Sequence, residues 1–532
     1  MPPRDSAHPG DAHGVFGGAG VRMAVVEQLE RASGNGRRLR LANPATLQPL
    51  GEVDVQSAAD VRAAIECARK SQPAWAALSF EERGHYLERV VRVILERQEE
   101  LLDVITRETG KPRVEALATE IVTSCDALQF YAKRAKQVLA ERTLPLHLLK
   151  TKKLRIAYKP LGVIGIITPW NFPFLLTLNP TAQALMAGNA VVLKPSEATP
   201  FSARCVQEIL DAAGLPEGVF NLVTGDGETG EALVEAGVDK ISFTGSVATG
   251  RKVAEICGRN LVPCTLELGG KDPMIVCADA DLDRASRGAV FGAFANSGQV
   301  CTSTERVYVV DEVAEEFTRR CVERTSELRQ GADGEFDVGS IILPSQLEII
   351  ESHVEDAVAR GARLLAGGRR NPNEPGYFYE PTILTDVTHD MRVMREETFG
   401  PVLPIMRVAD EAEAVKHAND SRYGLNANVW TRNKHKGTDL ARAIESGCVV
   451  VNDCMVTYAV AESPFGGVKD SGIGRVNGAV GLRGFCVVQS IVIDRRSGRS
   501  EMLWFPYSQR TLVAIKRMMR FVWGTSLGRW LS

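Results

Sequence analysis

Hydrophobic and polar residues are arranged along this chain in two different patterns. From Ala58 to about Val138, apolar positions recur at helical spacing within long charged runs such as EERGHYLERVVRVILERQEELLDVI. Short apolar strands then alternate with helical stretches, first VIGIIT, AVVLK, VFNLVT and KISFT, and after Glu267 PMIVCAD, ERVYVV, LPIMRV, ANVWT and CVVVND. Continuous apolar strands separated by helices are typical of parallel sheets covered on both faces. The pattern predicts an α/β fold with two parallel-sheet domains and a small β extension.

The composition narrows the class of protein. The 532 residues are too many for one compact core, and a formal net charge of −3 gives no overall field that would attract nucleic acid. The eleven cysteines form no CxxC pair and no Cys/His metal spacing, so we expect no metal site and no disulfide framework. Residues 1–20 are rich in Gly, Pro and His, lack the apolar core of a signal peptide and are predicted to be disordered. No stretch approaches the roughly 18 apolar residues that span a bilayer, so a cytoplasmic protein is expected.

Four segments carry the candidate chemistry. GVIGIITPWNFPF (162–174) begins as a buried strand, and LELGGKDP (266–273) contains two adjacent glycines that let backbone approach closely. FANSGQVCTSTERVYV (294–309) contains a cysteine in a loop of small and polar residues, and EETFGPVLP (396–404) follows later. In combination these segments resemble the aldehyde dehydrogenase superfamily, and the resemblance extends from about residue 40 to about residue 495. It implies that both parallel sheets are doubly wound, one in a Rossmann-like cofactor domain and one in a catalytic domain.

The resemblance assigns catalytic roles to three residues. Cys301 matches the family's nucleophile, a role that suits a thiolate because it attacks carbonyls readily and forms a thioester that water can open. Asn171 matches the side-chain donor of the oxyanion hole, which it shares with the backbone N–H of Cys301. Glu267 matches the general base that activates the deacylating water. The implied reaction oxidises an aldehyde to a carboxylic acid and reduces NAD(P)⁺, through a thiohemiacetal and a thioester on Cys301.

Each of these residues also has a plainer interpretation. A cysteine in an α/β protein is usually a small core residue, Asn171 could turn the chain after Pro169 and Trp170, and Glu267 could be a solvated charge. Family members that pass the acyl group to coenzyme A lack the glutamate, so Glu267 favours hydrolysis over acyl-CoA formation. A catalytically silent binding or structural member is a further alternative, although such proteins usually lose the cysteine or the glutamate.

Two glycine-rich segments compete for the cofactor phosphates. GDGETG (225–230) matches the GxGxxG pattern of dinucleotide-binding folds, but the acidic residue expected about 20 residues later is missing. The resemblance instead favours FTGSVATG (243–250), where Ser246 begins a helix whose free amides and dipole suit the pyrophosphate. Gly225 would then lie beside the adenine, with a plain turn as the alternative.

The rest of the implied site binds the ribose groups and the nicotinamide. Lys194 and Glu197 match the adenosine-ribose segment, and a carboxylate there would repel a 2′-phosphate, so NAD is predicted as the cofactor, with NADP as the alternative. Phe399 would contact the nicotinamide, with core packing as the plainer interpretation. The implied cofactor-binding residues are Ile167, Trp170, Lys194, Glu197, Gly225, Ser246, Leu268, Glu397 and Phe399.

The resemblance also implies an apolar channel and an oligomer. The expected channel residues are Phe172, Phe174, Leu175 and Phe465. The strands near 150–158 and 486–494 match the element that bridges subunits, so a homodimer or homotetramer is expected. The predicted organisation is an NAD-binding domain at 21–138 and 159–267, oligomerisation strands at 139–158 and 482–495, and a catalytic domain at 268–481.

The C-terminal tail, residues 496–532, departs from the family. Its apolar positions at helical spacing between 511 and 523 are Leu512, Ile515, Met519 and Val522, and its basic residues on the other side are Lys516, Arg517 and Arg520. A basic amphipathic helix with Trp and Phe is typical of a membrane interface, so residues 511–532 are predicted to contact a membrane surface peripherally. The alternative is that the tail covers the channel mouth or a partner subunit. A lipophilic aldehyde is one expected substrate, and a small acidic aldehyde such as succinate semialdehyde is the other.

Overall fold

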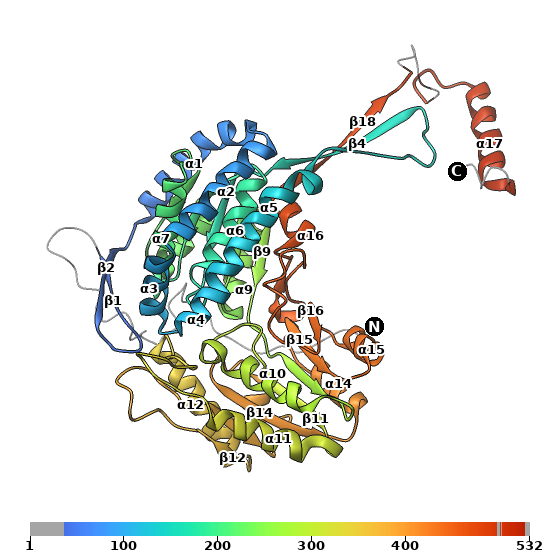
Figure 1. Cartoon of the computed structure of the whole chain (residues 1–532). Helices are drawn as coiled ribbons and strands as arrows, with labels where there is room; N and C mark the ends of the chain where they lie inside the picture. The colour runs from blue at the N-terminus through green and yellow to red at the C-terminus, as the bar shows by residue number, and fades with distance from the viewer. Residues whose placement is uncertain (1–36, 497–500, 502, 527–532) are drawn as a thin grey trace, which may run out of the picture.

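The computed structural model describes residues 37–496, 501 and 503–526, which form two α/β units and a projecting arm (Figure 1). Residues 1–20, predicted to be disordered, lie outside the described residues. Within the described part of the chain, no helix is both long enough and apolar enough to cross a membrane.

The first unit contains a six-stranded sheet in the order β17-β9-β8-β5-β6-β7, in which only β17 runs antiparallel to its neighbour. Its strands are β5 (Val163–Ile167), β6 (Ala190–Lys194), β7 (Phe220–Leu222), β8 (Lys240–Thr244), β9 (Cys264–Glu267) and β17 (Gly472–Ile473). Alternate residues of β6 enter two separate cores, Val191 and Leu193 on one face, Ala190 and Val192 on the other. This burial on both faces explains why the strands are continuous apolar runs.

Helices cover both faces of this sheet (Figure 1). They are α1 (Ala58–Ala77), α2 (Phe80–Glu96), α3 (Gln98–Thr109), α4 (Arg113–Glu115), the π-helix η1 (Ala116–Val122), α5 (Thr123–Leu139), α6 (Leu175–Met186), α7 (Pro200–Ala212), α8 (Gly227–Glu235), α9 (Val247–Asn260) and α16 (Gly478–Arg483). Serine begins two of them: Ser57 and Ser79 each form a capping box with the acidic residue three positions later, which satisfies free backbone amides at the helix start.

The second unit contains a seven-stranded sheet in the order β12-β13-β14-β11-β10-β15-β16, in which only β12 is antiparallel. Its strands are β10 (Pro273–Val276), β11 (Arg306–Val310), β12 (Arg363–Ala366), β13 (Thr382–Thr385), β14 (Val402–Val408), β15 (Asn426–Trp430) and β16 (Cys448–Val451). Its helices are α10 (Leu282–Phe294), η2 (Ala295–Gly298), α11 (Asp311–Ser326), α12 (Pro344–Ala359), α13 (Arg392–Arg395), α14 (Glu411–Asn419) and α15 (Lys434–Ala443), and η3 (Lys469–Ser471) leads into β17.

The arm is a three-stranded antiparallel sheet that extends away from the two units (Figure 1). Its strands are β3 (Arg142–Leu144), β4 (Lys152–Pro160) and β18 (Cys486–Asp494), and α17 (Gln509–Gly524) lies beyond its tip. β18 pairs with β4 along its whole length, from Cys486 opposite Pro160 to Asp494 opposite Lys152. A separate hairpin is formed by β1 (Arg38–Ala42) and β2 (Pro49–Asp54).

The α/β class with two parallel-sheet units is confirmed, and every apolar run predicted as a strand forms one. One detail differs from the predicted organisation. β17 falls inside the 268–481 segment, yet it pairs with β9 of the first sheet. Gly472 permits this because its φ is +144° and a Cβ atom there would collide with the Leu266 carbonyl. The late segment around β17 therefore completes the edge of the first sheet.

Candidate functional site

The predicted site residues lie at the carboxyl ends of the parallel strands of the first sheet. Ile167, Lys194 and Glu267 are the last residues of β5, β6 and β9, and Ser246 comes two residues after β8. Parallel α/β sheets bind their ligands at this edge. A cavity of about 300 Å³ opens there. Among the residues that line it are the predicted Asn171, Glu267 and Cys301, together with Trp170, Ser246, Leu268, Glu397, Phe399 and Phe465.

Asn171 lies in the loop between β5 and α6 and is almost wholly buried. Its side-chain amide donates a hydrogen bond to the carbonyl of Gln299, at 2.9 Å. Its own backbone carbonyl accepts one bond from Lys111 Nζ at 2.8 Å and one from Asn296 Nδ2 at 3.1 Å. These bonds hold the Asn171 loop against the loop that precedes Cys301.

Cys301 follows a tightly wound loop. Asn296 and Ser297 both have left-handed backbone, with φ of 49° and 56°, a conformation that costs energy for residues other than glycine. Burial, followed by the nearby carboxyl groups of Asp272 and Glu267, raises the pKa of the Cys301 thiol. In this state the sulfur is a neutral thiol, and it needs a base or a nearby positive charge to become a nucleophile.

Glu267 is buried at the end of β9, only 5% exposed. Neither of its carboxyl oxygens has a hydrogen-bond partner among the described residues. Burial raises its pKa well above the usual value, and Arg475 opposes that rise only in part. Gly466 keeps the carboxyl accessible, because a Cβ atom there would come within 2.7 Å of Glu267 Oε1. An unpartnered buried carboxyl in a cavity is the arrangement expected of a group that exchanges a proton with a ligand or water.

A second cavity of about 430 Å³ adjoins the first. The two cavities share Pro169, Trp170, Thr244, Gly245, Ser246 and Leu343. Ser246 caps α9 by accepting a bond from the Thr249 amide, so the start of this helix, which attracts phosphate, opens on both cavities.

Lys194 and Glu197 line the second cavity and form an ion pair at 3.1 Å. Burial by itself would raise the pKa of Glu197, but the Lys194 charge and hydrogen bonds to the carboxylate outweigh it and lower the pKa. A charged carboxylate is therefore present where the sequence predicted an acceptor for ribose hydroxyls.

The GDGETG segment lines the second cavity, but through other residues than the predicted Gly225. Gly225 does not line this cavity, whereas Gly227 and Gly230 do. Its φ is +154°, and a Cβ atom there would collide with the Thr229 side chain. Glycine is thus required at 225 for the turn into α8, which was the plainer interpretation, and the contact with adenine has no support from this geometry.

Glu397 and Phe399 lie on the loop between α13 and β14. Glu397 accepts a bond from the Gly270 amide at 2.9 Å, and burial, reinforced by Glu305, raises its pKa to about 7. Phe399 has a φ of 48°, rare for a large side chain, and its amide donates to Glu305 Oε1 at 2.8 Å. Its ring meets Trp170 edge to face, with centroids 5.3 Å apart. Phe399 therefore forms part of the cavity wall and is not a core residue.

The predicted channel residues separate into two groups. Phe465 lines the cavity, and its ring packs edge to face against Tyr458 at 5.0 Å. Phe174, by contrast, is wholly buried in the hydrophobic core of the first unit, so its prediction as a channel residue is corrected. Phe172 stacks under Lys111 Nζ at 4.1 Å, and Leu176 rather than Leu175 lines the cavity. The lining residues that the sequence did not indicate are Leu176, Leu343, Gln346, Ile349, Leu425 and Tyr458.

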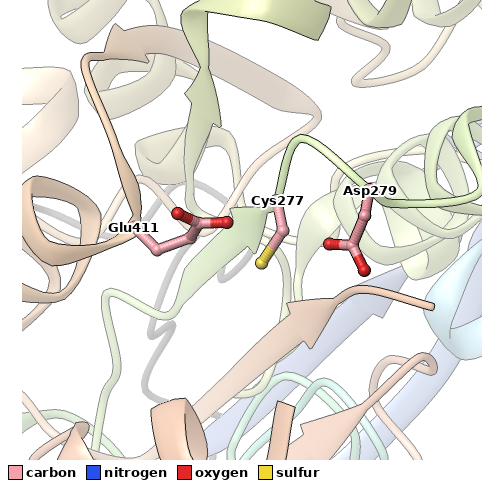
Figure 2. A group of neighbouring side chains, drawn as sticks. All are labelled: Cys277, Asp279 and Glu411. Atoms are coloured by element: carbon pink, nitrogen blue, oxygen red, sulfur yellow. The ribbon is translucent and has the colours of Figure 1, made fainter. Parts of the chain in front are cut away.

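Cys277, Asp279 and Glu411 of the second unit form a cluster whose ligand atoms lie within 4.8 Å of one another (Figure 2). Its spacing would suit a metal ion. Lys436 Nζ already contacts both carboxylates, at 2.6 Å from Asp279 and 2.8 Å from Glu411. The ammonium group therefore balances the acidic charge, and the cluster gives no reason to revise the expectation that the protein holds no metal.

Comparison with known proteins agrees with this geometry. The model of the Aldehyde dehydrogenase family matches residues 31–491. A 4,4′-diapolycopene aldehyde oxidase of Methylomonas is 40% identical over 477 residues, 89% of each chain. A putative succinate-semialdehyde dehydrogenase [NADP(+)] of Mycobacterium ulcerans is 40% identical over 89% of this chain and 92% of its own. The NAD⁺ complex of an aldehyde dehydrogenase from Bacillus cereus superposes with a TM-score of 0.82 and 35% identity, over 86% of this chain and 93% of that one.

Proposed function

Because this chain belongs to the aldehyde dehydrogenase family, which oxidises aldehydes to carboxylic acids with NAD(P)⁺, we propose that Cys301, Asn171 and Glu267 perform that reaction here. The observation that supports this assignment most is the shared cavity. It brings the Cys301 thiol, the Asn171 amide and the unpartnered carboxyl of Glu267 into one space next to the cavity lined by Lys194, Glu197 and Ser246. The test is NADH or NADPH formation with an aldehyde in the absence of coenzyme A, which a silent family member or an acyl-CoA-forming enzyme would not support.

In the first half of the reaction, the Cys301 sulfur passes its proton to solvent water and forms a bond to the aldehyde carbon. The carbonyl oxygen gains negative charge, and the Asn171 amide and the Cys301 backbone N–H stabilise it, each such donor being worth about 3 kcal/mol. The bound NAD(P)⁺ supplies the hydride acceptor. When the hydride leaves the carbon, the thiohemiacetal becomes a thioester on Cys301.

In the second half, Glu267 removes a proton from water, and the water oxygen bonds to the thioester carbon. The carbon–sulfur bond then breaks, the carboxylic acid leaves, and the sulfur is restored. Glu267 suits this step because its carboxyl oxygens have no competing hydrogen bonds among the described residues, and burial raises its pKa well above the usual value, which makes the ionised carboxylate a stronger base. The presence of this glutamate favours hydrolysis over transfer to coenzyme A.

We assign the remaining cofactor contacts from the residues that line the two cavities. The start of α9 near Ser246 would hold the pyrophosphate, and Lys194 and Glu197 would hold the adenosine ribose. The residues that would hold the nicotinamide are Trp170, Leu268, Glu397 and Phe399. Ile167, the last residue of β5, lines the adenosine cavity. On this assignment the unit around the six-stranded sheet is the cofactor domain and the unit around the seven-stranded sheet, with Cys301, is the catalytic domain.

Replacing Glu197 with serine is expected to raise the NADP⁺ to NAD⁺ ratio of kcat/KM by about tenfold. The substitution removes a carboxylate that repels a 2′-phosphate and leaves Lys194 free to face it. Initial rates with both nucleotides measure the ratio, and Glu231→Ser, which removes another carboxylate lining the same cavity, is the matched control. An unchanged ratio for Glu197→Ser would mean that Glu197 does not face the ribose.

The cavity favours a lipophilic aldehyde over a small acidic one. Its described lining includes Leu176, Leu343, Ile349, Leu425 and Phe465, and no lysine or arginine is among the lining residues. A second carboxylate, as in succinate semialdehyde, would therefore lack a cationic partner and would be costly to bury. The relatives carry names of both kinds, one for a carotenoid aldehyde and one for succinate semialdehyde. Initial rates across aldehydes of rising chain length, with succinate semialdehyde included, decide between the two classes.

The arm supports a homodimer or homotetramer. β18 exposes large apolar side chains to solvent, among them Val487, Val488 and Val492, each about half exposed or more. Exposed apolar strands that project from a folded body are unfavourable unless another chain covers them. Light scattering on the purified protein should therefore give a mass of two or four chains of 57.8 kDa.

The C-terminal tail is the element proposed to contact a membrane surface. None of the residues of α17 is buried, and the helix lies beyond the tip of the arm, away from the cavity that holds Cys301 (Figure 1). This position disfavours a lid over the channel of the same subunit. Apolar and aromatic side chains around the helix are largely exposed, among them Trp504, Phe505, Tyr507, Phe521 and Trp523. Residues 527–532 lie outside the described chain.

Truncation after Asp494 is expected to release the protein from anionic vesicles in a sedimentation assay. Each Lys or Arg near an anionic surface contributes about 1 kcal/mol, and the aromatic face adds an apolar contribution that salt does not screen. Turnover of a short soluble aldehyde should stay close to that of the full chain. If the full chain stays in the supernatant and truncation changes KM instead, the tail belongs to the channel or to a partner subunit.

A further inference from the structure

The segment between α3 and α5, residues 111–122, has two properties that its sequence alone does not explain. It contains a π-helix, η1, and π-helical turns are rare and often occur at functional sites. It also buries an ion pair: Lys111 Nζ lies 2.6 Å from Glu120 Oε1, and neither side chain is exposed. Burying two charges costs more free energy than burying apolar side chains of the same volume, so packing alone does not account for the pair.

Both members of the pair bond to the loop that contains Asn171. Lys111 Nζ donates to the Asn171 backbone carbonyl at 2.8 Å. Glu120 Oε2 accepts from the backbone amides of Phe174 and Leu175, at 2.8 and 3.3 Å, where α6 begins. The ion pair therefore holds the loop at two points, at the Asn171 carbonyl and at the start of α6.

The same segment also reaches the loop before Cys301. Glu115 accepts from the Asn296 amide, at 3.0 Å to one carboxyl oxygen and 3.2 Å to the other. Asn296 Nδ2 in turn donates to the Asn171 carbonyl at 3.1 Å. Residues 111–122 therefore contact both loops, the one with Asn171 and the one before Cys301. The relative position of these loops decides whether the Asn171 amide and the Cys301 N–H can donate hydrogen bonds to the same oxygen atom.

We propose that Lys111 and Glu120 are positioning residues for the oxyanion hole, which act on the reaction by fixing the Asn171 amide relative to Cys301. The proposal rests on the proposed role of Asn171. A loop displaced by about 1 Å is enough to cost one to two orders of magnitude in rate, because the donors must meet the developing oxyanion. The pair does not line the cavity, so it touches neither aldehyde nor nucleotide.

The test is a double-mutant cycle between this pair and Asn171. Lys111→Met/Glu120→Gln removes both charges together, which avoids leaving one buried charge without its partner. We expect the first-turnover rate of NADH formation to fall about tenfold, with the Kd of NAD⁺ unchanged. In an Asn171→Ala background the same double substitution should slow that rate by less than about twofold, since the group that it positions is already gone.

The matched control is a second buried pair of the same kind. Lys271 and Glu305 are also ion-paired at 2.5 Å, and Glu305 accepts from the amides of Thr398 and Phe399 on the cofactor side. Lys271→Met/Glu305→Gln should weaken NAD⁺ binding, and its effect on the rate should be the same with or without Asn171.

The outcomes separate the two proposals. A rate unaffected by Asn171→Ala alone overturns the role of Asn171 and the inference with it. Suppose instead that Asn171→Ala slows the reaction. If the Lys111/Glu120 substitution then lowers the first-turnover rate by the same factor with and without Asn171, or does not lower it in either background, only the positioning role is overturned. Should the double variant not fold, Glu120→Gln alone is measured in the same cycle. It should lower the first-turnover rate by a smaller factor, and this decrease must likewise vanish in the Asn171→Ala background.

Discussion

Replacing Cys301 with serine is expected to lower kcat by at least about a thousandfold while NAD⁺ binding is retained. A serine hydroxyl is scarcely ionised at neutral pH, and the buried cavity that already raises the pKa of the Cys301 thiol would oppose an alkoxide even more strongly. The ester formed on serine would also replace the more reactive thioester. Steady-state NADH formation measures kcat, and nucleotide binding shows that the variant is folded.

A matched control exists for this substitution. Cys448 belongs to the same small apolar cluster as Cys301, but it does not line the cavity. Cys448→Ser should therefore keep most of the activity. Turnover of Cys301→Ser close to that of the unmodified protein would remove the nucleophile assignment, whichever result the control gives.

Replacing Glu267 with glutamine is expected to divide the reaction into two phases. NADH should appear in a burst of about one equivalent per active subunit, followed by turnover about a hundredfold slower than normal, because deacylation depends on the base more than acylation does. Rapid mixing with absorbance detection measures both phases. A proportional loss of burst and steady state would place the base elsewhere in the cavity.

The pH dependence of the deacylation rate gives a second test of the role of Glu267. Glu267 acts as a base only when it is ionised, and burial holds its pKa well above the usual value. The ionised fraction therefore grows as the pH rises above the range in which a glutamate usually titrates, and the deacylation rate of the unmodified protein should grow with it. In Glu267→Gln this rise should be absent from the slow phase, since an amide does not titrate in that range.

The sequence predicted the strands, and it indicated three residues that the structure brings to one cavity, Asn171, Glu267 and Cys301, but it predicted less of the rest of the cavity wall. Apolar runs such as 163–167 and 190–194 identify strands because burial on a sheet imposes a visible pattern. The short strands β9, β12, β13 and β17 were not predicted, because two to four residues carry too little pattern. The wall residues Leu176 and Tyr458 could not be found either, since helix periodicity shows that a face is apolar but not which element it meets.

Charged residues were the least predictable part. Lys111 and Glu120 lie in a stretch whose many charges indicate a solvated amphipathic helix, and yet both side chains are wholly buried. The role of Gly225 was hard to predict for a related reason. A glycine pattern shows where the backbone needs freedom, but it does not say whether a ligand or a neighbouring side chain, here Thr229, imposes that need.

The pairing of β17 with β9 has a consequence for how the protein is made. Glu267 ends β9, and the strand that closes over it comes from near the end of the chain; Ser471 Oγ donates to the Gly269 carbonyl across 202 residues of sequence. A ribosome must therefore release almost the whole polypeptide before the base has its surroundings. Until then the cavity around the Cys301 thiol and the Glu267 carboxyl lacks Tyr458, Phe465 and the β17 edge, so these two groups are enclosed only late in synthesis.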